Sequence, residues 1–143
     1  MLGHWEHYEH DADVGVRGLG ETKAEAFQQA ALAMSAAVAE VDTVRPLERI
    51  SVHCEARDDE LLLAEWLNAL VYEMATRRML FSKFDVRIEN GRLSADAWGE
   101  GLDPHRHRPV VELKGATPTT LRVARHGDGW LAQTVVDVSS RRP

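Results

Sequence analysis

The sequence predicts an α+β fold, in which a mostly antiparallel sheet of six or more strands carries two amphipathic helices on one face. Two observations lead to this prediction. Two long segments repeat apolar residues at helical spacing, and several shorter segments alternate apolar with polar residues between turn signals. The length of 143 residues and the absence of low-complexity tracts predict one domain over residues 1–143.

Two strands are expected near the N-terminus. Val14 and Val16 alternate with other residues ahead of a break at Gly18, which predicts a strand over residues 14–19. A further strand is expected from about Trp5 to Glu9. Because the two segments are close in the chain, we expect a hairpin or a neighbouring pair.

The two helices are predicted over residues 22–40 and 59–78. Thr22 and Glu25 have the spacing of a capping box, and apolar residues recur along one stripe of each segment. Both stripes should face the sheet. Four large side chains of these stripes are expected to be buried: Phe27, Met34, Trp66 and Leu70.

The remaining strands are separated by polar turns. Alternating residues predict a strand around Ile50 to Cys54, between the helices. After Phe81 the pattern has a period of two, and Asn90-Gly91 is a strong signal for a type I′ hairpin. Three further strands are expected near residues 110–114, 121–125 and 130–138.

Composition and charge limit the classes of function that the sequence can support. The formal net charge of −6 argues against free-standing nucleic-acid binding, which needs a clustered cationic surface. The chain has a single cysteine, Cys54, and therefore cannot form an intramolecular disulfide, which is consistent with a reducing compartment. The sequence lacks an N-terminal leader pattern and any apolar stretch long enough for a membrane span, so we expect a cytoplasmic protein without membrane contact.

His10, Asp11 and Asp13 form the first candidate site, in a predicted turn ahead of a strand. Carboxylates and main-chain carbonyls are the ligands that hard divalent cations prefer, and a single short loop needs further ligands from elsewhere in the chain. The alternative is that Asp11 and Asp13 only cap the turn through hydrogen bonds to the main chain.

Asp137 is the second candidate. It shares a strand face with Val135, Gln133 and Leu131, so a carboxylate ends an otherwise largely apolar row. A desolvated carboxylate requires hydrogen bonds, an ion pair or a cation. The alternative is a solvated acid at the strand end, next to the basic tail Arg141-Arg142.

Other reactive residues are interpreted as structural. His4, His7 and His10 recur every third residue, a spacing that alternates faces on a strand. His105 and His107 lie in a segment with loop signals and are expected to be solvated. Cys54 is interpreted as a buried structural thiol, and no phosphate-binding loop or serine-hydrolase motif is present.

Several segments together resemble a known family. YEHDADVGVRGLGETKAEAFQQAALAM is similar to the signature of the archease family, whose usual form is close to YEHTADVGIRAYGKTLEEAFENAALAM. The similarity continues through LLLAEWLNALVYE, GEGLDPHRH and the closing TVVDV, in the same order. It therefore covers nearly the whole chain.

The resemblance implies a small protein cofactor of the RtcB-type RNA ligase, which joins RNA ends in tRNA splicing and RNA repair using GTP and a divalent metal. Such a protein would promote guanylylation and repeated turnover of the ligase without being an enzyme. The family's metal site maps onto Asp13, Asp137 and the carbonyl of Val138. Calcium is the expected ion, with magnesium or manganese as alternatives. The competing interpretations are a stand-alone metal-dependent phosphoesterase that uses the same acids and a chaperone-like protein-binding module.

Two departures from the family pattern concern the surroundings of this site. Asp11 replaces the usual threonine, which adds a further ligand or an ion-pair partner. Pro118-Thr119 replaces the usual Tyr-His, so any role of that histidine is absent from this chain.

Overall fold

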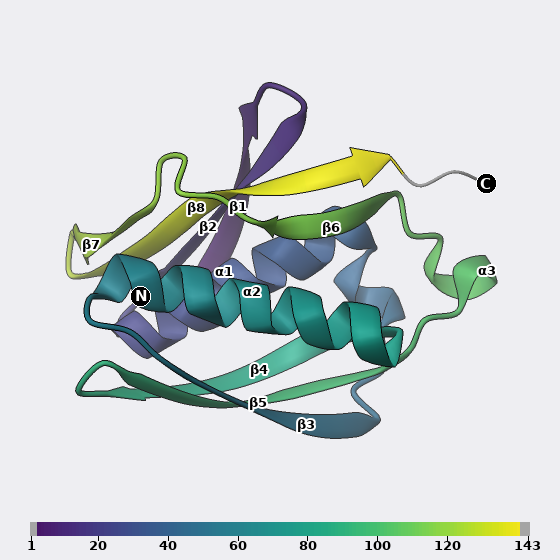
Figure 1. The fold of residues 1–143 in the computed structure, drawn as a ribbon, viewed down its shortest axis with the longest axis horizontal. Coiled ribbons are helices and arrows are strands. Elements are labelled where there is room, and N and C mark those ends of the chain that lie inside the picture. The colour runs from purple at the N-terminus through teal and green to yellow at the C-terminus, as the bar shows by residue number, and fades with distance from the viewer. Residues whose placement is uncertain (1–2, 141–143) are drawn as a thin grey trace.

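The computed structural model describes residues 3–140 and arranges them in three layers. Helices α1 (Lys23–Val38) and α2 (Asp59–Arg77) lie between a five-stranded sheet and a three-stranded sheet (Figure 1). The other elements are β1 (His4–His10), β2 (Asp13–Gly20), η1 (Val41–Thr43), β3 (Glu48–Glu55), β4 (Met79–Glu89), β5 (Arg92–Gly101), α3 (Pro104–His107), β6 (Val111–Ala116), β7 (Arg122–His126) and β8 (Gly129–Ser140).

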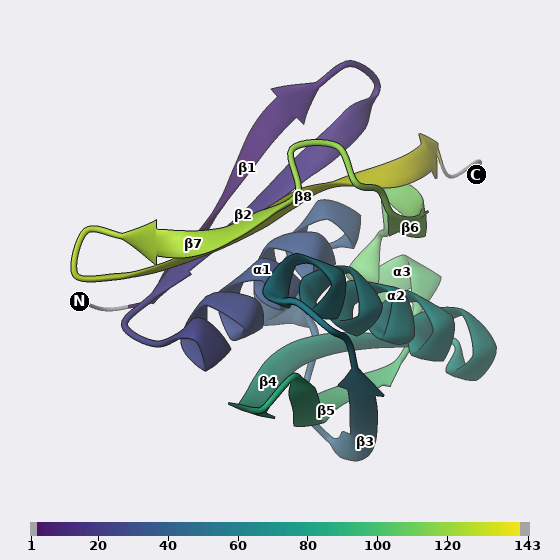
Figure 2. The ribbon, with the colours of Figure 1, turned by 60° about the vertical axis from the view of Figure 1, so that its left-hand side comes forward.

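The five-stranded sheet joins the two ends of the chain. Its order is β1-β2-β8-β6, and β7 also pairs with β8. All of its pairs are antiparallel. The β1–β2 hairpin projects beyond the body of the sheet (Figure 2). Strand β8 is therefore the element that brings the C-terminal segment beside the N-terminal motif.

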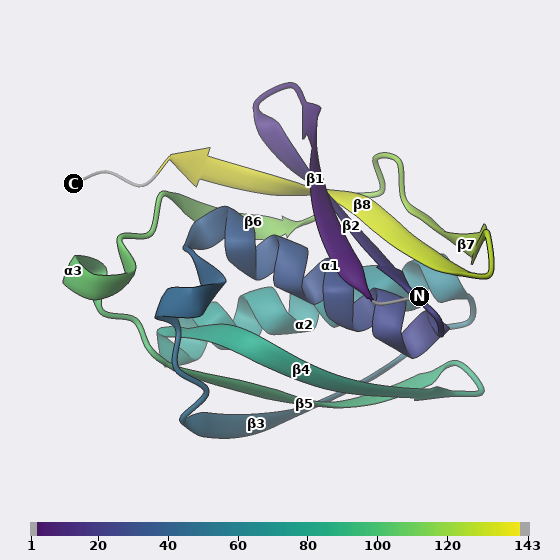
Figure 3. The same cartoon turned by 180° about the vertical axis from the view of Figure 1, so that it is seen from behind.

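The three-stranded sheet has the order β3-β5-β4 and is also antiparallel. Asn90 and Gly91 both have positive φ, 51° and 74°, and connect β4 to β5 as the Asn-Gly signal predicts. This sheet covers the other side of the helix pair (Figure 3).

The helices begin and end close to the predicted positions. The side chain of Thr22 accepts a hydrogen bond from the N–H of Glu25, and Asp58 caps α2 in the same way through the N–H of Leu61. The four side chains expected in the core, those of Phe27, Met34, Trp66 and Leu70, are fully buried. Within residues 3–140, no helix has both the length and the apolar character that crossing a bilayer requires.

The α+β class, the antiparallel strands and the two long helices are confirmed. The expectation of one sheet with helices on one face needs a correction, because the strands divide into two sheets that enclose the helices. Alternation along a strand predicts which side chains face a core, but it carries no information about which distant strands pair.

Three outer strands have a main-chain N–H group bonded to a helix side chain. Gln28 accepts from Val86 on β4 at 2.9 Å. Asn68 accepts from Ala116 on β6 at 2.9 Å, and Glu60 of α2 accepts from β7 at 2.8 Å. These contacts fix the edges of both sheets to the helix layer and satisfy donors that would otherwise be unpaired.

Candidate metal site

The two candidate acids lie at the same end of neighbouring strands. The pairing of β2 with β8 includes Gly15 opposite Val135 and Val14 opposite Val136. The next position in this antiparallel register places Asp13 opposite Asp137. In addition, Oδ1 of Asp13 accepts a hydrogen bond from the N–H of Val138 at 3.2 Å. The fold thus brings together acids that are 124 positions apart in the sequence.

The main chain of Val138 adds an oxygen at this end. In an extended antiparallel strand, the N–H and C=O of one residue point toward the same neighbouring strand. The N–H of Val138 points toward Asp13, so its carbonyl is directed to the same side. The β2–β8 ladder ends at the Val14–Val136 pair, which leaves Val138 beyond the last paired residue of β2.

Asp137 is exposed, which agrees with the alternative of a solvated acid at the strand end. Ala132, Thr134 and Val136 are buried on one face of β8, and Val135, on the face that also carries Asp137, is buried as well. Asp137 is therefore the first exposed residue after a run of three buried ones. The basic tail Arg141-Arg142, which was the alternative partner for this acid, lies outside the described residues.

His10 and Asp11 flank the site at the hairpin turn. His10 pairs with Asp13 in the β1–β2 register. Asp11 has a φ of 54°, and its side chain is 93% exposed, 3.8 Å from Nδ1 of His10. An aspartate tolerates this left-handed conformation because its short side chain can form local hydrogen bonds. Asp11 is thus placed as an ion-pair partner for a protonated His10.

The three N-terminal histidines have separate partners. The ring of His7 bonds the carbonyl of Ala33 on α1 at 2.7 Å, while His4 lies 3.6 Å from Glu6. His10 is next to Asp11, as described above. The structure therefore gives each ring a different neighbour.

Tyr8 explains the glycine of the N-terminal motif. Its ring lies over Gly15, and its hydroxyl is 2.6 Å from Oγ1 of Thr120. The guanidinium of Arg17 lies 4.6 Å from the centre of the same ring. The tyrosine thus ties β1 and β2 to the segment that follows β6.

The segment with Pro118-Thr119 is held by main-chain contacts to β8. The N–H of Thr117 donates to the carbonyl of Val135 at 2.9 Å, and the N–H of Val135 donates to the carbonyl of Thr119 at 3.1 Å. Because these bonds use the main chain, the replacement of Tyr-His leaves them in place.

The donor set fits a hard divalent cation that keeps most of its water. Two carboxylates and one main-chain carbonyl are oxygen ligands of the kind that calcium and magnesium prefer. Among residues 3–140, no group of three or more histidine, cysteine, aspartate or glutamate side chains is arranged to hold a metal ion. The arrangement is therefore sparser than the ligand set that a stand-alone metallophosphoesterase needs.

Comparison with known protein families identifies the chain. Residues 5–138 match the model of the Archease protein family (MTH1598/TM1083). The chain belongs to the archease family. The sequence is 39% identical to the protein archease of Pyrococcus furiosus over 139 residues, which cover 94% of this chain and 98% of that relative.

Two solved structures have the same archease fold. The solution structure of protein 1598 of Methanobacterium thermoautotrophicum superposes with a TM-score of 0.81 at 28% identity, over 93% of this chain and 97% of that one. The crystal structure of an archease from Thermotoga maritima, described as a possible chaperone, gives a TM-score of 0.55 at 17% identity over 94% and 96% of the two chains.

A second polar cluster fixes the GEGLDPHRH segment of this archease. Glu100 is buried, and its carboxylate contacts Arg45 at 3.1 Å, Arg106 at 2.6 Å and Nε2 of His107 at 3.0 Å. Burial alone would raise the pKa of Glu100, but hydrogen bonds from Arg106, Arg45 and His107 outweigh it and hold the pKa far below its usual value.

His107 corrects the expectation of a solvated loop. The residue is buried in a short helix, α3, and its Nδ1 accepts the main-chain N–H of Asp103 at 2.9 Å. The ring proton is therefore on Nε2, which donates to Glu100. The sequence carries loop signals here, but the partner of this histidine is a carboxylate on β5 that only the fold identifies.

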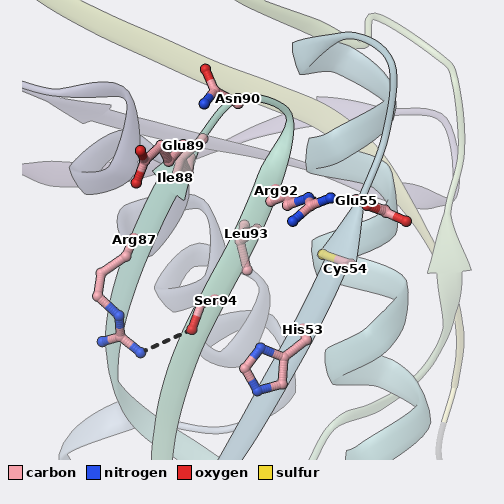
Figure 4. Close-up of a pocket in the computed structure, with 10 residues that line it drawn as sticks. All are labelled: His53, Cys54, Glu55, Arg87, Ile88, Glu89, Asn90, Arg92, Leu93 and Ser94. Atoms are coloured by element: carbon pink, nitrogen blue, oxygen red, sulfur yellow. Dashed lines mark hydrogen bonds and ion pairs between the residues drawn. The ribbon is translucent and has the colours of Figure 1, made fainter.

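Cys54 lies in an open pocket at the β4–β5 hairpin end (Figure 4). The pocket is lined from β3, β4 and β5, and Arg87 donates to Ser94 across it at 3.2 Å. Burial, together with the charge of Glu65, raises the pKa of Cys54 to about 11. The thiol is therefore uncharged at neutral pH and poorly suited to act as a nucleophile.

Proposed function

We propose that this archease is a metal-binding accessory protein that activates an RtcB-type RNA ligase by promoting its guanylylation and multiple turnover. The observation that carries the proposal is the position of Asp13, which lies one residue beyond the last β2–β8 pair, Val14–Val136, and accepts a hydrogen bond from the N–H of Val138, the residue that follows Asp137. A partner protein can reach this end without unfolding either strand.

The proposed metal site consists of Asp13, Asp137 and the carbonyl of Val138. When bound, a divalent cation would supply positive charge that can be shared with phosphate oxygens at a partner's active site. Asp13 has a second role in orienting the site, because its hydrogen bond to the N–H of Val138 fixes the end of β8 against β2. We propose calcium as the ion, with magnesium and manganese as alternatives.

Charge supports docking to a basic partner surface. The chain has 17 lysines and arginines against 23 acidic residues. An excess of acid disfavours direct binding to RNA but favours approach to a cationic channel on another protein. We therefore propose that the contact is with the ligase and that the RNA stays on the ligase.

The test is a multiple-turnover RNA-joining assay with purified ligase, GTP and a divalent-ion titration. The variants are Asp13→Asn and Asp137→Asn, which retain side-chain shape and the acceptor for Val138. Asp128→Asn is the matched control, because Asp128 is also exposed but lies in the turn at the opposite end of β8. We expect the wild type and Asp128→Asn to raise joining and guanylylation, and the two site variants to lose this gain.

Two outcomes would contradict the proposal in different ways. Equal stimulation of the ligase by all four proteins would show that the two acids are structural and would contradict the proposed metal site. If the wild type does not stimulate the ligase at any metal concentration, the proposed accessory role is wrong.

A further inference from the structure

A groove lies between the C-terminal half of α2 and β6, the last strand in the order of the five-stranded sheet. At one end the side chain of Asn68 joins the two elements by accepting a hydrogen bond from the N–H of Ala116 at 2.9 Å. Beyond this contact they line a cavity of about 390 Å³. None of the three proposed metal ligands lines this cavity, so the groove is a separate feature of the fold.

The walls of the groove are mostly apolar. On α2 they are formed at the spacing i, i+3 and i+4 by Val71, Met74 and Ala75, and on β6 by Val111 and Leu113. None of these five residues is buried, although all of them are apolar. The lining also includes three buried side chains, those of Val38, Met79 and Leu80. A cavity of this size and character is of the kind that takes an apolar ligand group.

Main-chain hydrogen bonds hold the far end of the groove. The N–H of Leu102 donates to the carbonyl of Arg78 at 2.8 Å, and the N–H of Val110 donates to the carbonyl of Val38 at 2.9 Å. Asn68 holds the other end through β6. The walls are therefore fixed before a ligand arrives, and a preformed site loses little conformational entropy on binding.

Arg78 supplies an unused positive charge to the groove. Among residues 3–140, no hydrogen bond or ion pair involves its side chain, whereas the preceding residue, Arg77, pairs with Glu73 at 2.6 Å. Arg78 follows the last turn of α2 with a φ of 53°, a conformation in which glycine is the usual residue. The end of the helix therefore does not explain an arginine at this position, and its guanidinium is available to an anion.

The charges favour a carboxylate as that anion. A guanidinium binds carboxylates and phosphates through paired hydrogen bonds. Among the described residues that line the groove, Glu112 on β6 is the only acid. Its charge disfavours a dianion, such as a phosphate monoester, more strongly than a singly charged carboxylate. The groove thus matches an apolar group that carries one carboxylate.

The edge of β6 favours a peptide as the source of this carboxylate. Among the described strands, β6 pairs with β8 alone, and α2 lies along its other side (Figure 1). An edge strand offers main-chain groups to an extended peptide. From Asn68 to Arg78 an α-helix rises about 15 Å, the length of about four extended residues. A peptide that ends at Arg78 would run antiparallel to β6.

We propose that this groove binds the carboxyl terminus of a partner protein, as an extended segment whose last side chain is apolar. Arg78 binds the terminal carboxylate, and the apolar side chain enters the cavity between Met74 and Leu113. The main chain of the segment lies along the edge of β6. The inference is independent of the proposed metal site.

The test is an NMR titration of the ¹⁵N-labelled protein with acetylated pentapeptides, in the absence of any ligase. The peptides are Gly-Ser-Ala-Ala followed by Leu, Val or Met, each with a free carboxylate or a terminal amide, and decanoate is a further probe. We expect the free acids to shift the amide resonances of Met74, Arg78 and Glu112. The amides should bind at least about tenfold more weakly, because they carry no charge for the guanidinium.

Three variants separate the role of Arg78 in binding from its role in the helix end. Arg78→Gly should weaken binding of the free acids at least about tenfold and should keep or raise the melting temperature, because glycine adopts this conformation readily. Ala75→Phe should block the cavity and remove binding. Arg77→Gln is the matched control and should bind as the wild type does, because Arg77 does not line the groove.

Three results would overturn the proposal. They are absence of shifts with every peptide at about 1 mM, equal affinity for acids and amides, and unchanged binding by Arg78→Gly. Tighter binding of decanoate than of every peptide would also overturn it, because the groove would then be a site for a free apolar acid. Since no ligase is present, each of these results is separate from the outcome of the joining assay.

Discussion

The ring of Tyr8 on β1 lies so close over Gly15 on β2 that a Cβ atom at Gly15 would be 2.3 Å from Cε2 of the tyrosine. This contact accounts for the glycine in the segment Asp13-Val14-Gly15, two residues from the candidate metal ligand. It also couples the hairpin to the segment after β6 through the hydroxyl contact with Thr120.

Gly15→Ala should displace the tyrosine and lower the free energy of unfolding by about 1–3 kcal/mol, the usual cost of overpacking. Urea denaturation measures this change. The same substitution in a Tyr8→Ala background should cost much less, because the clashing ring is gone. Equal costs in the two backgrounds would contradict the proposed contact.

Leu70→Ala should lower the free energy of unfolding by about 2–5 kcal/mol, because the side chain is fully buried between the sheets. Leu61→Ala provides a control on the same helix, where the leucine is 38% exposed, and should cost less than about 1 kcal/mol. Denaturant unfolding of both variants gives the comparison. A cost for Leu61→Ala as large as that for Leu70→Ala would argue against the three-layer core.

Glu100→Gln should destabilise the protein by about 3 kcal/mol at pH 7, because two arginines and a histidine lose their buried carboxylate. The pKa of Glu100 lies below its ordinary value of 4.5. Its stabilising effect is therefore complete above that value and is lost as the pH falls below it. Urea titrations at several pH values measure the difference in free energy of unfolding between the wild type and the variant. This difference should become smaller as the pH falls below about 4.5. A difference that does not change with pH would mean that the charge of Glu100 is not what stabilises this cluster.

A divalent cation should raise the melting temperature of the wild type, because a ligand that binds only the folded state stabilises it. Thermal scans with increasing calcium or magnesium measure the effect. Asp137→Asn should lose this rise and otherwise melt close to the wild type, because the carboxylate is exposed and has no partner among the described residues. An identical rise in the variant would place the bound ion elsewhere.

Cys54 should react slowly with a thiol reagent in the native protein. Burial raises the pKa of the thiol to about 11, so the reactive thiolate is scarce at pH 8. Rates of reaction with a disulfide reagent from pH 7 to pH 10 should stay far below those of the protein unfolded in urea. Fast labelling of the folded protein at pH 7 would show an activated cysteine and reopen a nucleophilic role.

The sequence by itself determined the local structure. Capping by Thr22, the Asn90-Gly91 hairpin and the apolar stripes with Phe27 and Trp66 depend on residues that are close in the chain, so their spacing was enough to predict them. Asp13 and Asp137 could be identified from the sequence as candidate metal ligands, because a carboxylate in or beside a strand needs a hydrogen bond, an ion pair or a cation if it is desolvated.

Only the tertiary structure decided how these segments meet. The division into two sheets, the neighbouring positions of Asp13 and Asp137 and the pairing of His107 with Glu100 all depend on contacts between different strands or helices. Alternation specifies the face of a residue, whereas register and strand order are set by the packing of the whole core, which a local pattern does not contain.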